Sequence, residues 1–213
     1  MLAFSELFWS QQSSIPLLLI LQLLPLFGAA VVLLLGERPS AVRPAKIFAL
    51  PDLFLSIFAI SRINPTLPAL QLAERFEPLA YHVAVDGLSM VFLLLSALLT
   101  FLMTLYGMSR GMISPGRLFA VLLVAEAGLV GMLVTLNVAW FAAFSALELW
   151  VVAFLLRRWA SSRAEIQALA RFVQYQAFGW VLFAAGCLVL GWSHADATGG
   201  RWSFDLFDLA QTL

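Results

Sequence analysis

Two carboxylates and one guanidinium lie within long apolar stretches of this 213-residue sequence: Glu126, Glu148 and Arg171. Insertion scales put the cost of an ionisable side chain at the centre of a membrane helix on the order of 2.5–3.5 kcal/mol, so such residues call for an explanation. A carboxyl group in apolar surroundings can take up and release a proton near neutral pH. The two glutamates are therefore candidates for proton handling, with Glu148 the principal one. Arg171 is a third candidate, which would act through a carboxylate or a water chain.

The two glutamates are evenly spaced about Asn137, with Glu126 eleven residues before it and Glu148 eleven residues after it. If the chain turns there, both carboxylates lie about 16 Å from the turn at the helical rise of roughly 1.5 Å per residue. Half of a hydrocarbon core is roughly 15 Å thick, so the spacing predicts that both lie near the bilayer midplane. Glu126 has a second interpretation, as a protonated and hydrogen-bonded packing residue.

Three other charged residues have two interpretations each. The long stem of Arg171 could reach the lipid headgroups, or its guanidinium could face inward and pair with a carboxylate or polarise a water chain. Asp86 precedes a helix start, where we expect it to act as an N-cap that accepts from first-turn amides, rather than to take part in catalysis. Asp52, beside Pro51, either faces the helix bundle or indicates that the helix around it is misplaced.

The elements that carry these residues follow from composition. Hydrophobic residues make up 62% of the chain and charged residues 11%, against roughly 45–50% and about 25% in soluble domains. Lipid offers no partner to backbone N–H and C=O groups, so continuous apolar runs of about 18 residues or more must be helical. We expect an all-α integral membrane protein with about six transmembrane helices. They cover residues 15–35, 44–60, 88–108, 118–136, 139–156 and 166–192.

We expect residues 1–213 to form a single membrane domain. Residues Ser61–Tyr81 and Ser193–Arg201 are predicted to be polar connections. The tail 202–213 fits a short amphipathic helix at the membrane interface, with Ser203 as its cap, although a frayed terminus fits equally well. The first ten residues hold Glu6 and no cation, unlike the start of a signal peptide.

Charge bias predicts the orientation of the helices. The connections after the first, third and fifth helices hold eight of the twelve cationic residues: Arg38, Arg43, Lys46, Arg110, Arg117, Arg157, Arg158 and Arg163. The positive-inside rule then places both termini on the non-cytoplasmic side of an inner (cytoplasmic) membrane.

Several functions are not supported by the sequence. The net charge is zero, so nothing suggests a nucleic-acid partner. Cys187 falls inside a predicted helix, and His82 and His194 are far apart in polar connections, so we expect no metal, iron–sulfur cluster or other cofactor. The chain also has no nucleotide fingerprint and no redox or hydrolytic site.

Four motifs, in order along the chain, resemble those of the antiporter-like membrane subunits of complex I, which are related to the Mrp-type cation/proton antiporters. The motifs are Asp86-Gly-Leu-Ser-Met90, Ser145-Ala-Leu-Glu-Leu149, Ala168-Leu-Ala-Arg-Phe-Val-Gln-Tyr175 and Ser203-Phe-Asp-Leu-Phe-Asp-Leu209. The resemblance implies that Glu148 is the proton-channel glutamate of the family. Arg171 stands where the family has lysine, and arginine effectively cannot release its proton.

The chain also departs from that family, because it stops after six predicted helices where family members continue with many more. The resemblance therefore implies an accessory or component subunit of a larger membrane complex linked to proton translocation. The alternative is the N-terminal half of a split pump that a second chain completes. In either case the expected partners are other membrane subunits and lipids. Any enzyme activity would belong to an NADH:quinone oxidoreductase-like complex as a whole.

Overall fold

The computed structural model describes residues 6–36, 42–109, 115–160 and 162–212. Among them are six helices that are long and apolar enough to cross a membrane, which confirms the predicted class of an all-α membrane protein. The chain forms two compact units. The first unit comprises Met1–Glu74 and Ala84–Val134, and the second comprises Arg75–Val83 and Thr135–Leu213.

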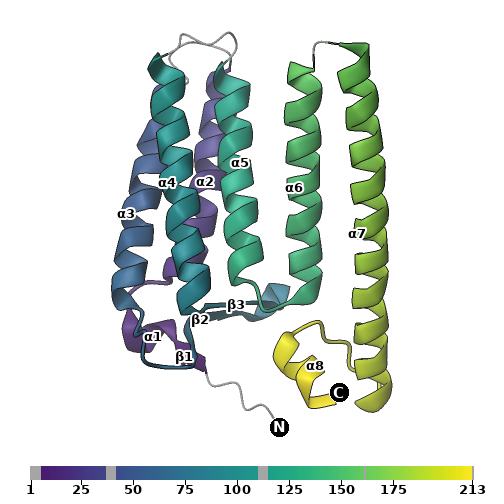
Figure 1. Ribbon diagram of the computed structural model, residues 1–213. Helices are drawn as coiled ribbons and strands as arrows, with labels where there is room; N and C mark the ends of the chain where they lie inside the picture. The colour runs from purple at the N-terminus through teal and green to yellow at the C-terminus, as the bar shows by residue number, and fades with distance from the viewer. Residues whose placement is uncertain (1–5, 37–41, 110–114, 161, 213) are drawn as a thin grey trace. The chain divides into compact units, whose positions relative to one another are not determined.

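The first unit is built on four long helices that pack side by side (Figure 1). Small and branched side chains let α2 and α5 approach closely, and their shared core includes Ala29, Val32, Phe119, Ala120 and Leu123. The four helices are α2 (Leu17–Leu35), α3 (Val42–Arg62), α4 (Gly87–Ser109) and α5 (Pro115–Val134).

Gly28 marks a close approach between α2 and α3. A Cβ atom at this position would lie 2.7 Å from Cβ and Cγ of Phe48, so only glycine fits without a shift. The ring of Phe48 also packs edge-on against Phe27, with 5.7 Å between the centroids. These two helices therefore contact each other through aromatic side chains packed over a glycine.

The connection predicted over residues 61–81 contains the strand β2 and the short helix η2, and β3 begins at its last residue. The strands form a three-stranded sheet in the order β1-β2-β3, with β1 parallel to β2. The elements are β1 (Glu6–Phe8), α1 (Trp9–Gln12), β2 (Leu70–Phe76), η2 (Glu77–Leu79) and β3 (Tyr81–Val85).

The second unit contains an antiparallel pair of long helices, α6 (Val138–Trp159) and α7 (Arg163–Ala197), followed by the short helix α8 (Leu206–Thr212) (Figure 1). The Asn137 side chain caps α6 by accepting from two first-turn amides. Ser162 and Glu165 form a capping box at the start of α7.

Helix α7 is longer than predicted, because residues 193–197 continue the helix instead of starting a loop. His194, expected in a polar connection, is a buried residue of this last turn. The short C-terminal helix is present, but Asp205 directly precedes it, whereas Ser203 lies three residues before its start. Its place at a membrane interface stays a prediction.

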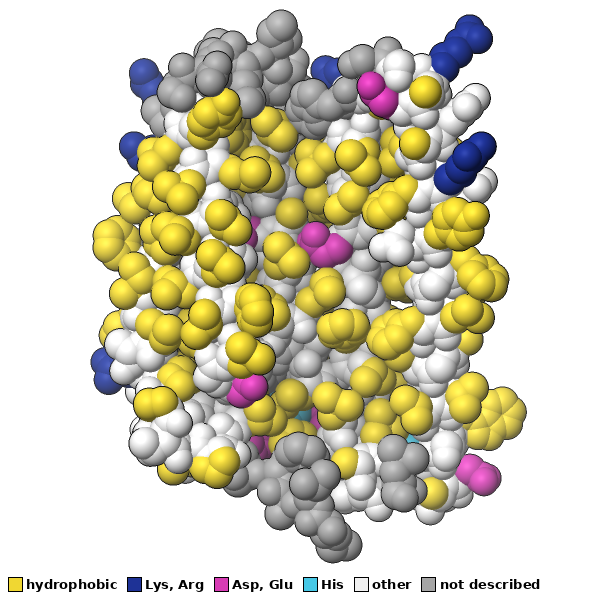
Figure 2. All heavy atoms as spheres, viewed as in Figure 1, with side chains coloured by type: hydrophobic (Ala, Val, Ile, Leu, Met, Phe, Trp, Pro, Cys, Tyr) yellow, Lys and Arg dark blue, Asp and Glu magenta, His cyan; other side chains and the backbone are white. Residues whose placement is uncertain are grey.

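Hydrophobic side chains cover most of the helical surface in Figure 2, with cationic side chains mainly toward the helix ends. This distribution suits helices surrounded by lipid or by other membrane helices. The side of the membrane on which the termini lie stays a prediction, as does the common depth of Glu126 and Glu148, which belong to different units. Arg38 and Arg110 lie outside the described residues.

Candidate functional site

Glu126 is buried in the middle of the first unit, with 1% of its surface exposed. Two hydroxyl groups of α4 lie against its carboxyl group. Ser96 Oγ is 3.0 Å from Oε1, and Thr100 Oγ1 donates to Oε2 at 2.6 Å. Ser96 and Thr100 share one face of α4 because they are four residues apart. The carboxyl group is thus buried and hydrogen-bonded, and its role in proton handling stays a prediction.

Asp52 is a second buried acid in the same unit, only 2% exposed and ten residues from each end of α3. Its helix, α3, packs against α5, the helix that carries Glu126. Of the two interpretations of Asp52, the structure therefore supports the one in which it faces the bundle. Sequence reasoning did not pair it with Glu126.

Glu148 and Arg171 lie on the two long helices of the second unit. Glu148 is half-buried on α6, ten residues after the helix start and eleven before its end. Arg171 is exposed on α7, eight residues after the helix start. At roughly 1.5 Å per residue, this places Arg171 about 12 Å along its helix. Their roles in proton handling stay predictions.

Asp86 lies at the start of α4, where its Oδ1 accepts a hydrogen bond from the Ser89 N–H at 2.7 Å. The Asp86 carbonyl oxygen also accepts from the Met90 N–H at 3.1 Å. This is the geometry of an N-cap residue, which satisfies amides that have no partner within the helix.

Glu74 was not singled out from the sequence, yet its carboxylate binds the start of the first long helix. It is 7% exposed, and it accepts from the Leu18 N–H at 2.8 Å and the Leu19 N–H at 3.0 Å. Pro16, which precedes α2, offers no side-chain cap of its own. Burial raises the pKa of Glu74 to about 7, although the two amide hydrogen bonds act in the opposite direction.

His82 and Asp205 form a second polar contact outside the long helices. His82 Nδ1 lies 2.6 Å from Asp205 Oδ2, with 3% of the His82 side chain and 18% of the Asp205 side chain exposed. Burial alone would raise the pKa of Asp205. The hydrogen bonds from His82 and the Phe207 amide, together with the charges of His82 and Arg75, outweigh it and lower that pKa.

Backbone hydrogen bonds join the same segments of the second unit. The Leu136 N–H donates to the His82 carbonyl oxygen at 2.8 Å, and the Leu206 N–H donates to the Leu136 carbonyl oxygen at 2.9 Å. The Asn137 side-chain amide donates to the Ala80 carbonyl oxygen at 3.0 Å. These bonds hold together three segments: the chain before α6, the end of η2 and the segment before α8.

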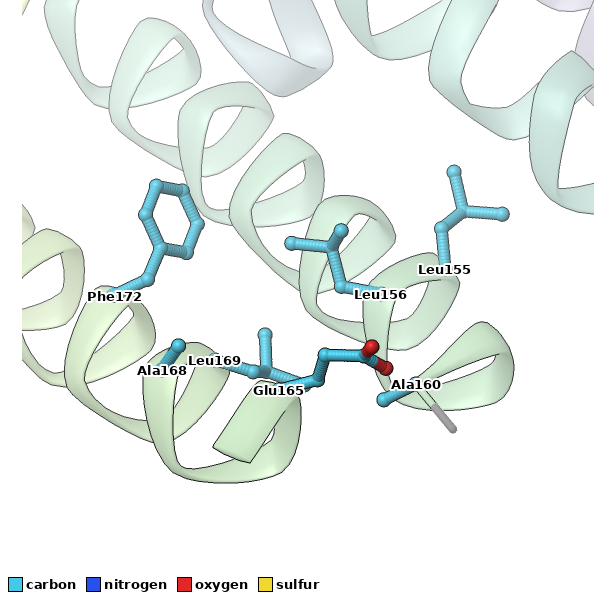
Figure 3. Close-up of a pocket in the computed structure, with 7 residues that line it drawn as sticks. All are labelled: Leu155, Leu156, Ala160, Glu165, Ala168, Leu169 and Phe172. Atoms are coloured by element: carbon cyan, nitrogen blue, oxygen red, sulfur yellow. The ribbon is translucent and has the colours of Figure 1, made fainter. Parts of the chain in front are cut away.

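A groove of about 520 Å³ lies between the end of α6 and the start of α7, and its lining is almost entirely apolar. Figure 3 shows Leu155 and Leu156 on the α6 side and Leu169 and Phe172 on the α7 side. Glu165, the one charged residue of the lining, accepts from the Ser162 N–H at 3.2 Å as part of the capping box. The groove therefore suits a lipid chain or an apolar side chain better than a reactive substrate.

No protein-family model matches the chain. It is 30% identical over 174 residues to NAD(P)H-quinone oxidoreductase chain 4 of Gloeobacter violaceus. It is also 26% identical over 200 residues to F(420)H(2) dehydrogenase subunit M of Methanosarcina mazei. With NADH-quinone oxidoreductase subunit M of Rhodobacter capsulatus, the identity is 29% over 185 residues. The chain is a homologue of complex I subunit M/chain 4.

These alignments cover most of this chain but less than half of each relative. They include 92%, 79% and 82% of the chain for the Methanosarcina, Gloeobacter and Rhodobacter proteins, and 40%, 32% and 35% of the proteins themselves.

A solved structure shares the fold of this chain. A chain of the membrane-bound sulfane sulfur reductase, an archaeal respiratory membrane complex, superposes with a TM-score of 0.74. The sequence identity is 19%, and the match covers 92% of this chain and 40% of the other. At this identity the similarity shows the fold alone.

Proposed function

We propose that the chain is a component or accessory subunit of a larger membrane complex linked to proton translocation. Its homology to subunits of NADH-quinone and F(420)H(2) oxidoreductases supports this proposal. The observation that carries it is the surface of α7. This helix leaves a long apolar face and a charged side chain exposed, which neighbouring membrane subunits would cover.

The exposed face of α7 carries a charged side chain, Arg171, within its first turns. Few of its residues are buried, and large apolar side chains such as Phe178, Leu182 and Val189 are more than half exposed. Arg171 is exposed about 12 Å along the same helix, where a charge facing hydrocarbon would be costly. A neighbouring subunit with a carboxylate or a polar group at that depth would lower this cost, and lipid would fill the remaining surface.

A second candidate function is proton conduction by this chain itself, as half of a split pump. The observation in its favour is the position of Glu148, half-buried and about 15 Å from either end of α6. In this role Glu148 binds and releases the proton. Arg171 stays charged and influences the proton affinity of nearby carboxyl groups without exchanging a proton itself.

We expect the complex in an inner (cytoplasmic) membrane. A pair of experiments on it distinguishes the two candidate functions. Glu148→Gln should leave proton transport by the intact complex nearly unchanged if the chain is accessory, and should abolish it at constant composition if the chain conducts. Glu77→Gln makes the same chemical change at an exposed position outside the long helices and serves as the control. Deletion of the accessory chain should instead release a neighbouring subunit.

A further inference from the structure

Four polar side chains lie near the middle of three packed and otherwise apolar helices of the first unit. They are Asp52 on α3, Ser96 and Thr100 on α4, and Glu126 on α5. Each lies nine or more residues from the start of its helix and eight or more from its end, or about 12 Å at least. Both acids are at least 98% buried, since 2% of Asp52 and 1% of Glu126 are exposed.

The two contacts of the Ser96 hydroxyl group favour a proton on the carboxyl group of Glu126. Ser96 Oγ is 3.0 Å from the Leu93 carbonyl oxygen and also 3.0 Å from Glu126 Oε1. A hydroxyl group has a single proton and can donate to only one of these two acceptors. If Glu126 is protonated on Oε1, it donates to Ser96, and Ser96 donates to Leu93, so both contacts are hydrogen bonds. The Thr100 hydroxyl still donates to Oε2 at 2.6 Å.

Asp52 supplies an independent observation at the same place. Its Oδ1 is buried and has no hydrogen-bond partner within the described part of the chain. The buried hydroxyl group of Ser56, one turn further along α3, donates to the Asp52 backbone oxygen at 3.0 Å. A bare carboxylate oxygen is costly to bury, whereas a proton held by the pair reduces the charge that must be buried.

The other titratable groups of the four packed helices lie toward the helix ends. Helix α2 contains no acidic, basic, histidine or tyrosine residue. The remaining groups within the helices are Arg43, Lys46 and Arg62 on α3, Tyr106 on α4 and Arg117 on α5. At the middle of the described helices, the charge of each acid is therefore sensed mainly by the other acid.

We propose that Asp52 and Glu126 form a coupled carboxyl pair that together binds a proton at the centre of the first unit. Two neighbouring carboxylates repel each other, so the pair holds its first proton more tightly than either acid would alone. Ser96 and Thr100 orient the glutamate. This site lies in a different unit from Glu148 and does not depend on the proposed function of that residue.

Infrared difference spectroscopy during a pH titration tests this proposal on the full chain in lipid vesicles. The loss of the proton should remove a carboxylic-acid C=O band. Carbon-13 labelling of the aspartate or glutamate carboxyl groups should shift this band, and the shifted component should be missing in Asp52→Asn for the aspartate label and in Glu126→Gln for the glutamate label. If neither label affects an acid band that disappears within the titrated range, the proposal is overturned.

Single amide variants test the coupling. We expect Asp52→Asn and Glu126→Gln each to loosen the proton on the remaining acid by at least about tenfold, because each removes the charge that the other senses. Glu77→Gln, at a solvent-exposed position outside the long helices, should change the binding of this proton less than about twofold. Equal proton binding in the single variants and the unaltered chain would overturn the coupling. Loss of the acid band on addition of NaCl at constant pH and ionic strength would assign the site to sodium ion and overturn the proton assignment.

Discussion

His82 Nδ1 and Asp205 Oδ2 lie 2.6 Å apart although 123 residues separate them in the chain. The contact joins β3 to the segment before α8, and backbone hydrogen bonds run beside it. The ring of Phe207 covers His82, with 5.5 Å between the ring centroids. The last residues of the chain are therefore anchored by a charge-assisted contact and are not only attached to the end of α7.

Removal of this contact should destabilise the second unit. We expect His82→Ala or Asp205→Asn to lower the free energy of unfolding by about 1–3 kcal/mol, because each leaves a buried polar partner unsatisfied. Thermal unfolding of the detergent-solubilised chain measures the change. Asp196→Asn alters an exposed aspartate of α7 and is the matched control. Equal melting temperatures for Asp205→Asn and Asp196→Asn would contradict the anchoring role.

The same contact predicts a loss of stability in acid. The folded state lowers the pKa of Asp205 below its ordinary value of 3.8. A lowered pKa contributes stability above the unfolded pKa, and this contribution is lost as the pH falls through the folded value. We expect unfolding curves of the unaltered chain and of Asp205→Asn to converge below about pH 4. A difference that persists unchanged as the pH falls well below 4 would contradict this prediction.

Glu74 should produce the opposite pH dependence in the first unit. Its pKa is raised from 4.5 to about 7 in the folded chain, so the stability it contributes is complete below the unfolded value. That contribution is lost as the pH rises through about 7, by on the order of 3 kcal/mol. Glu74→Gln should flatten the pH dependence of unfolding between these values. Glu77→Gln, at an exposed position nearby, should not.

The six long helices could be predicted from the sequence because each apolar run is long enough to span a membrane. Their ends could not, since these depend on tertiary contacts. Residues 193–197 are polar enough to resemble a loop, yet His194 and Ala195 are buried and the helix continues through them. The strands β2 and β3 are buried over most of their length, so they do not show the alternation of polar and apolar residues that identifies a half-buried strand.

The candidate site was predictable only in part. Glu126 stood out as a charge within an apolar run, but the sequence does not fix how its helix is rotated. Its hydrogen bonds with Ser96 and Thr100 are therefore visible only in the structure. Glu74 caps a helix 56 residues earlier in the chain, a distance at which no local capping pattern applies.

The close approach at Gly28 predicts a specific effect of a small substitution. Gly28→Ala should destabilise the first unit by about 1–3 kcal/mol, because the added methyl group collides with Phe48. Gly186→Ala makes the same change on α7, where nothing lies within 4 Å of the added atom. Since alanine favours helix over glycine, this control should be neutral or slightly stabilising. Equal thermal unfolding of both variants would contradict the packing argument.

Arg171 tests whether the exposed face of α7 meets another protein or the lipid headgroups. If a neighbouring subunit pairs with its guanidinium, Arg171→Gln leaves that partner unsatisfied, at a cost of about 2–5 kcal/mol for a buried pair. We then expect retention of the neighbouring subunit during purification of the complex in mild detergent to fall at least about tenfold. Arg163→Gln removes a charge from the exposed start of the same helix and should leave the composition unchanged. Full retention in Arg171→Gln would instead favour an arginine that extends to the headgroups, because removal of a solvated charge costs little.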